Sequence, residues 1–289
     1  MDIDQKSLER AREQLALELQ GRTLFDDKMV RLVLRNNTEV AKAILAPILG
    51  REDFKIISVS CQDVAQAPNS HSVWFDAVAK FDDGTVVDIE VQQRLDRAPK
   101  KRMRYYSSML DISSLETGKD YRELHPCIVI FIVRGDVGGA RLPIYHIRRI
   151  FQETGNEFGD ESEIIIVNVN CSDESTSLGK VMHDLKTQEP EDMCVPVIKT
   201  AVERVKYAIE EGTMDEELYE IIKTAMPEAY NEAVAKGREQ GLQEGREQGL
   251  QQGQRSAILS LVRDGSITLE KAASVLGISE KEVQALLNA

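Results

Sequence analysis

The sequence has little of what marks a secreted or membrane protein. Its four cysteines are scattered over 289 residues and none forms a C-x-x-C pair, which disfavours both zinc ligation and a disulfide framework. The longest apolar run, Cys127 to Val133, has seven residues, far fewer than a transmembrane helix needs. The first 20 residues are charged, with helical apolar spacing, and do not resemble a secretory signal. We therefore expect a cytoplasmic protein with no membrane partner.

Positive charge is also scarce. The formal net charge is −13, whereas a protein that binds nucleic acid usually carries a basic footprint. The exception is a cluster of six basic residues broken by a single acid, namely Arg94, Arg97, Lys100, Lys101, Arg102 and Arg104. A local patch of this kind can contact phosphates even on an acidic protein. The alternative is a solvated helix face, which is the more common fate of a charge run.

What the sequence does contain is an alternation of helix-like and strand-like segments from residue 21 to about 195. Apolar spacing predicts helices over residues 26–49, 99–115 and 178–187, and strands over residues 54–64, 73–81, 85–92, 127–134 and 163–169. Helices mixed with one sheet of about five strands indicate an α/β or α+β core.

After Val195 the pattern is helical throughout. It predicts helices over residues 196–210 and 215–225, then a segment with glycine at every fourth position from Gly237 to Gly253, then three short helices over residues 256–264, 268–276 and 279–287. This organisation predicts a first domain over residues 1–230, a glycine-rich stalk or linker over residues 231–255, and a small helical module over residues 256–289.

The C-terminal segments leave two questions open. The glycine repeat is either a flexible linker or a helix that pairs with a second copy of the chain, since glycines four apart stay on one face only in a right-handed coil. The three short helices resemble a helix-turn-helix. However, Glu270, Glu280 and Glu282 stand at the starts of the second and third of them, where a recognition helix would meet DNA. A packing or oligomerisation module fits at least as well.

Two strands joined by Asp82-Asp83-Gly84 form the most informative local feature. A glycine at the third loop position suits the left-handed residue that a three-residue hairpin turn needs. Counting outward from this turn sets Asp76 directly opposite Glu90. Because side chains alternate along a strand, Asp88 and Gln92 share the face of Glu90. A two-residue turn would slip the register by one and separate the pair.

Two carboxylates about 5 Å apart on facing strands repel each other unless a cation neutralises them. Magnesium prefers hard oxygen ligands, commonly one or two carboxylates completed by water and a substrate phosphate. The spacing therefore favours a metal site at Asp76 and Glu90. The alternative is that both acids decorate the solvated face of the hairpin.

These residues resemble the D…(D/E)-x-(K/Q) pattern of the PD-(D/E)XK nucleases, because Asp76 is followed after thirteen residues by Glu90-Val91-Gln92. More specifically, the chain resembles the bacterial PD-(D/E)XK nuclease family transposases, which are related to the Rpn-like recombination-promoting nucleases. The resemblance covers about residues 20–250. It extends to the segments Leu24–Met29, Pro99–Asp111, Gly118–Leu124 and Ile128–Ile132, and to the glycine-every-fourth tail.

The resemblance implies a restriction-endonuclease-like core and a particular ligand set. Asp76 and Glu90 would bind Mg²⁺, with Mn²⁺ as a substitute, and the Val91 carbonyl would be a third ligand. Asp27 would be an acid contributed by the first helix. Gln92 stands where the superfamily usually has lysine; an amide can orient groups by hydrogen bonds but cannot supply the positive charge.

The resemblance also implies DNA as the substrate. Phosphate contacts are expected from Lys100, Lys101, Arg102, Arg104 and Tyr106, although the Tyr106 ring has the alternative of packing against the sheet. The expected activity is that of a magnesium-dependent endodeoxyribonuclease that promotes recombination or acts on foreign DNA. The alternative is a DNA-binding or scaffold protein that keeps the nuclease fold with little turnover.

Overall fold

The computed structural model describes residues 17, 19, 21–61, 64–65, 71–93, 99–115, 117–210, 223 and 227–288. These residues divide into two units, one within residues 12–230 and one within residues 231–289. Apart from isolated positions, the helices predicted over residues 1–20 and 215–225 lie outside the described residues.

A mixed six-stranded sheet forms the centre of the first unit. Its strands are β1 (Ile56–Ser60), β4 (Ala77–Phe81), β5 (Val86–Gln92), β6 (Cys127–Val133), β7 (Ile144–Ile147) and β8 (Ser162–Asn168). They lie in the order β1-β4-β5-β6-β8-β7. The pairs β5/β6 and β6/β8 are parallel, and the remaining pairs are antiparallel. A separate two-stranded ribbon consists of β2 (Val64–Ala65) and β3 (Val73–Trp74).

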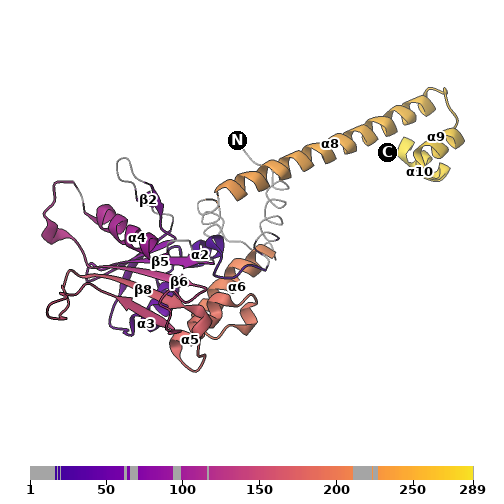
Figure 1. The fold of residues 1–289 in the computed structure, drawn as a ribbon. Helices are drawn as coiled ribbons and strands as arrows, with labels where there is room; N and C mark the ends of the chain where they lie inside the picture. The colour runs from indigo at the N-terminus through magenta and orange to yellow at the C-terminus, as the bar shows by residue number, and fades with distance from the viewer. Residues whose placement is uncertain are drawn as a thin grey trace. The chain divides into compact units, whose positions relative to one another are not determined.

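Helices cover the sheet (Figure 1). The α-helices of this unit are α2 (Asp27–Leu34), α3 (Thr38–Leu49), α4 (Pro99–Ser114), α5 (Ser177–Lys186) and α6 (Pro196–Glu210), and the 3₁₀ helices are η1 (Tyr121–Glu123), η2 (Val169–Cys171) and η3 (Pro190–Asp192). Helix α4 packs on β6 and β8, whereas α3 contacts β1, α5 and α6. No helix among the described residues is both long and apolar enough to cross a bilayer.

The central strands are buried on both faces, as parallel strands between helix layers usually are. On the side of α4, the core includes Val86, Val129 and Phe131 of the sheet together with Met103 and Met109 of the helix, among other residues. Most of the alternate residues of β5 and β6, which point to the opposite face, are also buried, and Ile128 is partly buried. The predicted mixture of helices with one sheet is confirmed.

Several element boundaries differ from the prediction; the strand predicted over residues 54–64, for example, is β1 followed by the start of β2 in the other sheet. The single helix predicted over residues 26–49 is two helices, because Asn36 takes a left-handed φ of +55° and the Asn37 side chain caps α3 by accepting a hydrogen bond from the Val40 amide. The strand predicted over residues 73–81 breaks into β3 and β4 around Asp76. Strand β7 was not predicted, since its four residues are partly or fully exposed and give little apolar contrast.

The second unit is helical. Helix α8 (Pro227–Arg263) continues through the glycine repeat, and it is followed by α9 (Leu269–Leu276) and α10 (Glu280–Asn288). The first of the three predicted short helices is therefore the end of α8. Thr268 caps α9 by accepting from the Lys271 amide, and Ser279 and Glu282 form the predicted capping box. Ala272, Ala273 and Val283 form the small buried core.

Candidate active site

The hairpin of β4 and β5 has the register that the sequence predicts. The Phe81 amide donates to the Thr85 carbonyl at 2.9 Å, and Ala77 pairs with Ile89 at the other end of the ladder. Gly84 takes a φ of +89°, the left-handed conformation expected at the third loop position. The next pair outward brings Asp76 opposite Glu90.

Asp76 and Glu90 each accept a hydrogen bond from the backbone of the opposite strand, just beyond the regular ladder of β4 and β5. The Asp76 amide donates to Oε1 of Glu90 at 2.9 Å, and the Val91 amide donates to Oδ2 of Asp76 at 3.0 Å. Each carboxylate thus takes the place of a backbone acceptor on the opposite strand. Charge-assisted bonds of this kind fix the two carboxylates relative to the sheet.

These acids do not lie on a solvated face. Asp76 is 7% exposed and Glu90 only 1% exposed, because α4 covers their side of the sheet. The solvated-face interpretation of this hairpin is therefore wrong. Buried ionised carboxylates are costly without a compensating cation or hydrogen bonds, so a bound cation would add to the stabilisation that the backbone amides give this pair.

Asp88 is a third acid in this cluster, and sequence reasoning did not assign it a role. It is fully buried, and neither of its carboxylate oxygens has a hydrogen-bond partner among the described residues. Orphaned polar atoms of this kind are rare in folded proteins. The alternation of Asp88, Glu90 and Gln92 on one face of β5 was the available signal. What the sequence did not reveal is that α4 would remove this face from water.

Burial and mutual repulsion act together on the protonation of these groups. Loss of hydration and then the charge of Asp76 raise the pKa of Asp88 well above its usual range, and the neighbouring Glu90 side chain offsets part of this rise. Loss of hydration, then the charges of Asp88 and Asp76, raise the pKa of Glu90 in the same direction. Both carboxyl groups therefore keep their protons to higher pH than isolated carboxyl groups do.

The donor set fits a hard divalent cation. Two fixed carboxylates with nearby backbone carbonyls are the ligands that Mg²⁺ takes alongside water and phosphate. Among the residues that the structure describes, Asp76, Asp88 and Glu90 do not converge closely enough for one ion to contact one oxygen of each. The arrangement therefore fits two carboxylate ligands better than three.

Val91 and Gln92 complete this end of β5. A residue's N–H and C=O point to the same edge of a strand, so the Val91 carbonyl points toward Asp76, which accepts from the Val91 amide. Gln92 is partly exposed at the end of the strand, on the same face as Glu90 by alternation. Gln93, the next residue, is anchored elsewhere and donates to the Phe25 carbonyl at 2.8 Å.

Two of the predicted phosphate contacts lie beside the acids. Nη2 of Arg102 donates to the Tyr106 hydroxyl at 2.9 Å, and the guanidinium lies 5.1 Å from the centre of the Tyr106 ring. The ring itself packs edge-on against Phe75 and Phe131, as its alternative interpretation required. Loss of hydration and the charge of Glu90 raise the pKa of Tyr106 to about 12. Arg102 partly offsets the repulsion at Glu90.

The other predicted site residues are not part of this cluster or cannot be assigned to it. Lys100, Lys101 and Arg104 are exposed on α4. Arg94 and Arg97 lie outside the described residues. Asp27 begins α2, and its side chain is also outside the described part of the chain.

A mixed six-stranded sheet flanked by helices, with buried acids fixed on a central hairpin, defines an α/β protein. The family model for the PD-(D/E)XK nuclease family transposases matches residues 35–231. This is more than half of the chain, and the chain belongs to that family. The searches of curated proteins and of solved structures gave no significant match. The resemblance noted in the sequence is confirmed, and nucleases of this kind generally use divalent metal ions.

Proposed function

We propose that the protein is a metal-dependent endonuclease that hydrolyses phosphodiester bonds in DNA, with Asp76, Glu90 and Gln92 at the centre of its active site. The reciprocal bonding of the two buried carboxylates to each other's strand is the observation that carries the proposal. It gives a rigid pair of hard oxygen ligands at a position where burial and the neighbouring acids raise the pKa of Glu90.

Asp76 and Glu90 would hold Mg²⁺, or Mn²⁺ in its place, together with the Val91 carbonyl. A divalent cation supplies Lewis-acid activation of the phosphoryl group and a bound water of lowered pKa. The protein's own contribution is positioning, since both carboxylates are fixed by backbone amides before any ligand arrives. Preorganisation of this kind avoids the cost of ordering the site during the reaction.

Gln92 would orient the attacking water or a phosphate oxygen by hydrogen bonds. An amide offers two donors and one acceptor but no charge. Arg102 is the cation near Glu90, and its bond to Tyr106 restricts its orientation. Tyr106 would act on the substrate through Arg102, since its ring is packed in the core.

Helix α4 would bind the DNA backbone beside the candidate active site. The helix lies over the acid-bearing face, and Lys100, Lys101 and Arg104 are exposed on it. Contacts from such residues to phosphates fix the position of the duplex without reading its sequence. Cleavage of this kind would promote recombination or act on foreign DNA.

The proposal is tested by incubating supercoiled plasmid with the purified protein in the presence and absence of Mg²⁺ or Mn²⁺. Asp76→Asn and Glu90→Gln keep the shape of each side chain but remove the anionic ligand. We expect each to lower cleavage by more than about 100-fold, as loss of a directly acting group does. Asp53→Asn, an exposed acid of the same unit, is the matched control and should cleave normally.

Two results would contradict the proposal. The first is cleavage by the wild-type protein that persists in a chelator. The second is equal activity in Asp76→Asn and Asp53→Asn. If the wild-type protein binds DNA but gives no cleavage with either metal, the protein is instead a scaffold that keeps the nuclease fold.

A further inference from the structure

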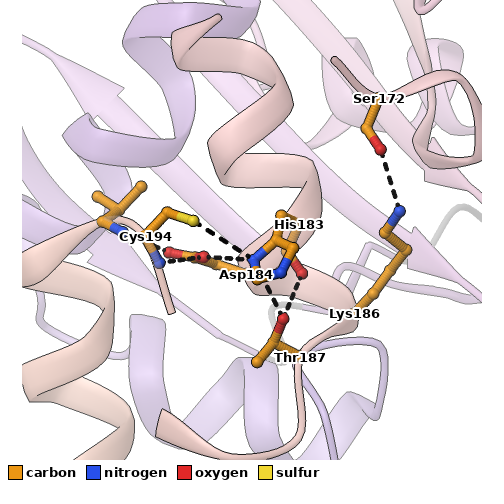
Figure 2. A network of polar contacts seen from close by, with 7 residues as sticks. Ser172, His183, Asp184, Lys186, Thr187 and Cys194 are labelled. Atoms are coloured by element: carbon orange, nitrogen blue, oxygen red, sulfur yellow. Dashed lines mark hydrogen bonds and ion pairs between the residues drawn. The ribbon is translucent and has the colours of Figure 1, made fainter. Parts of the chain in front are cut away.

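A second cluster of potential ligands lies between α5 and α6, apart from the acid-bearing hairpin. His183 and Asp184 are in the last turn of α5, and Cys194 lies two residues before α6 begins. Figure 2 shows the imidazole of His183, the carboxylate of Asp184 and the thiol of Cys194 turned toward one another. Within the described residues, these are the only three side chains whose ligand atoms all lie within 4.8 Å of one another.

The contacts of the cluster converge on one ring nitrogen. Nδ1 of His183 lies 3.1 Å from Oδ1 of Asp184 and 3.6 Å from Sγ of Cys194. A cysteine–histidine–aspartate relay would need the acid and the thiol on different ring nitrogens, because the acid orients one nitrogen while the other takes the proton. This geometry therefore does not support nucleophilic catalysis by Cys194.

The separations match those between ligands of a tetrahedral zinc ion. Zinc binds imidazole nitrogen at about 2.0 Å, carboxylate oxygen at about 2.0 Å and thiolate sulfur at about 2.3 Å. At tetrahedral angles these bond lengths place nitrogen and oxygen about 3.3 Å apart, and nitrogen and sulfur about 3.5 Å apart. The observed 3.1 Å and 3.6 Å are close to these values.

The cluster is also held in place and open to solvent. Asp184 is fully buried, and its two oxygens accept from the amides of Cys194 and Val195, each at 2.7 Å. Each oxygen keeps a further lone pair. Cys194 is exposed and His183 partly so, so an ion can reach them. Thr187, whose hydroxyl lies 3.2 Å from Nδ1 of His183, lines the remaining side.

We propose that His183, Asp184 and Cys194 bind a zinc ion that joins the end of α5 to the start of α6, with water as the fourth ligand. Nitrogen and thiolate ligands suit zinc and distinguish this site from the all-oxygen site on the hairpin. Zinc binds the thiolate, so binding releases the thiol proton and becomes tighter as pH rises.

The test uses the full chain and two metal probes. Zinc affinity is measured by competition with a chromophoric chelator, and Co²⁺ is added to a separate sample to record the charge-transfer absorption of a cobalt–thiolate bond. We expect one equivalent of zinc and a thiolate band. Cys194→Ser should abolish the band and weaken zinc binding by more than about 100-fold, which exceeds the loss from outer-shell changes. Asp184 is left intact because it also caps α6.

The control variants test whether the zinc affinity and the thiolate band come from this cluster and not from another part of the chain. Cys171→Ser and His146→Gln remove a cysteine and a histidine of the same unit and should leave both signals unchanged. Asp76→Asn should also leave them unchanged, so failure of the nuclease proposal would not affect the result. His183→Gln provides a second variant, with folding checked by circular dichroism. Absence of the thiolate band in the wild-type protein, or equal zinc affinity in Cys194→Ser and Cys171→Ser, overturns the proposal.

Discussion

At the scale of single residues, Asp88 has the least favourable electrostatic environment of the acid cluster. Asp88 has no hydrogen-bond donor among the described residues, and α4 keeps it from water. In most proteins a buried carboxylate is satisfied by amides or by a cation. Asp88 therefore lowers the stability of the metal-free protein wherever it is forced to ionise, and a bound cation removes that penalty.

We expect the metal-free protein to lose stability as pH rises. Asp88 and Glu90 have raised pKa values in the folded state, so the folded protein keeps protons that the unfolded chain releases above about pH 4. The contribution of these two groups to stability is then largest below that pH and is lost as pH rises through their folded-state pKa values. Asp88→Asn should raise the melting temperature by several degrees at pH 8 and by less at pH 5, given about 2 to 4 °C per kcal/mol for a domain of this size.

The measurement is a series of thermal melts in chelator between pH 5 and pH 8, with Asp53→Asn as the control for removing an exposed acid. Added Mg²⁺ should flatten the pH dependence of the wild-type protein. A melting temperature that is constant over this range in chelator would show that the cluster is compensated by other groups.

Gln92 is the residue at which this chain departs from the usual superfamily pattern. We expect Gln92→Lys to keep plasmid cleavage or to raise it, because lysine adds the positive charge that stabilises the transition state elsewhere in the superfamily. Gln93→Lys adds the same charge to a side chain that is anchored to Phe25 instead, and it should give no increase. Loss of activity in a folded Gln92→Lys variant would show that the amide geometry itself is required.

At the scale of elements, the β4–β5 turn and helix α4 determine the geometry and the burial of the candidate site. The turn fixes which residues of β4 and β5 face each other, and α4 determines whether those residues are shielded from water. Both elements can be altered by substitutions at residues that are not proposed metal ligands.

The β4–β5 turn contains a glycine, Gly84, that leaves no free space for a side chain. Gly84 has a φ of +89°, and a Cβ built there would lie 2.8 Å from Nδ1 of His125. Gly118 has a similar φ of +87° with nothing near it. We expect Gly84→Ala to cost about 1 to 3 kcal/mol and Gly118→Ala to cost about 1 to 2 kcal/mol. Chemical denaturation measures the free energy of unfolding of both variants. A smaller cost for Gly84→Ala than for Gly118→Ala would show that the His125 side chain moves away freely.

Helix α4 is expected to hold DNA through Lys100 and Lys101. Replacing both with alanine should weaken binding equally across DNA sequences and reduce the slope of log affinity against log salt by about two units, one per lost phosphate contact. Fluorescence anisotropy with labelled duplex, at several salt concentrations and without divalent metal, measures the slope. The double variant Lys55→Ala, Lys119→Ala removes the same charge from exposed positions elsewhere. An equal change in this slope in both double variants would show that the DNA does not bind specifically at Lys100 and Lys101.

At the scale of the whole molecule, the glycines of α8 are unusual in a continuous helix. Gly245, Gly249 and Gly253 have no neighbour within 4 Å of a built Cβ. Each costs about 1 kcal/mol relative to alanine. The triple alanine variant should therefore melt at a higher temperature by circular dichroism. Sedimentation of the same variant tests pairing: a lower assembly mass than the wild-type protein would show that a second copy packs against these glycines.

The sequence alone determined the local parts of this protein. The turn residues and the strand alternation set the register that brings Asp76 opposite Glu90, because a hairpin is specified by its own few residues. The caps at Thr268 and Ser279 begin α9 and α10 for the same reason. The resemblance to the nuclease family rests on this hairpin and on its neighbouring segments, and it predicted the fold class correctly.

The tertiary structure decided what depends on long-range packing. Burial of Asp88 results from α4 packing on its face of the sheet, and no local pattern states which face of a strand a distant helix will cover. Cys194 was set aside because no second cysteine stands near it in the sequence. Its neighbours His183 and Asp184 reach it only through the packing of α5 against the start of α6. Chemistry that arises from residues far apart in the chain becomes visible only when the fold brings them together.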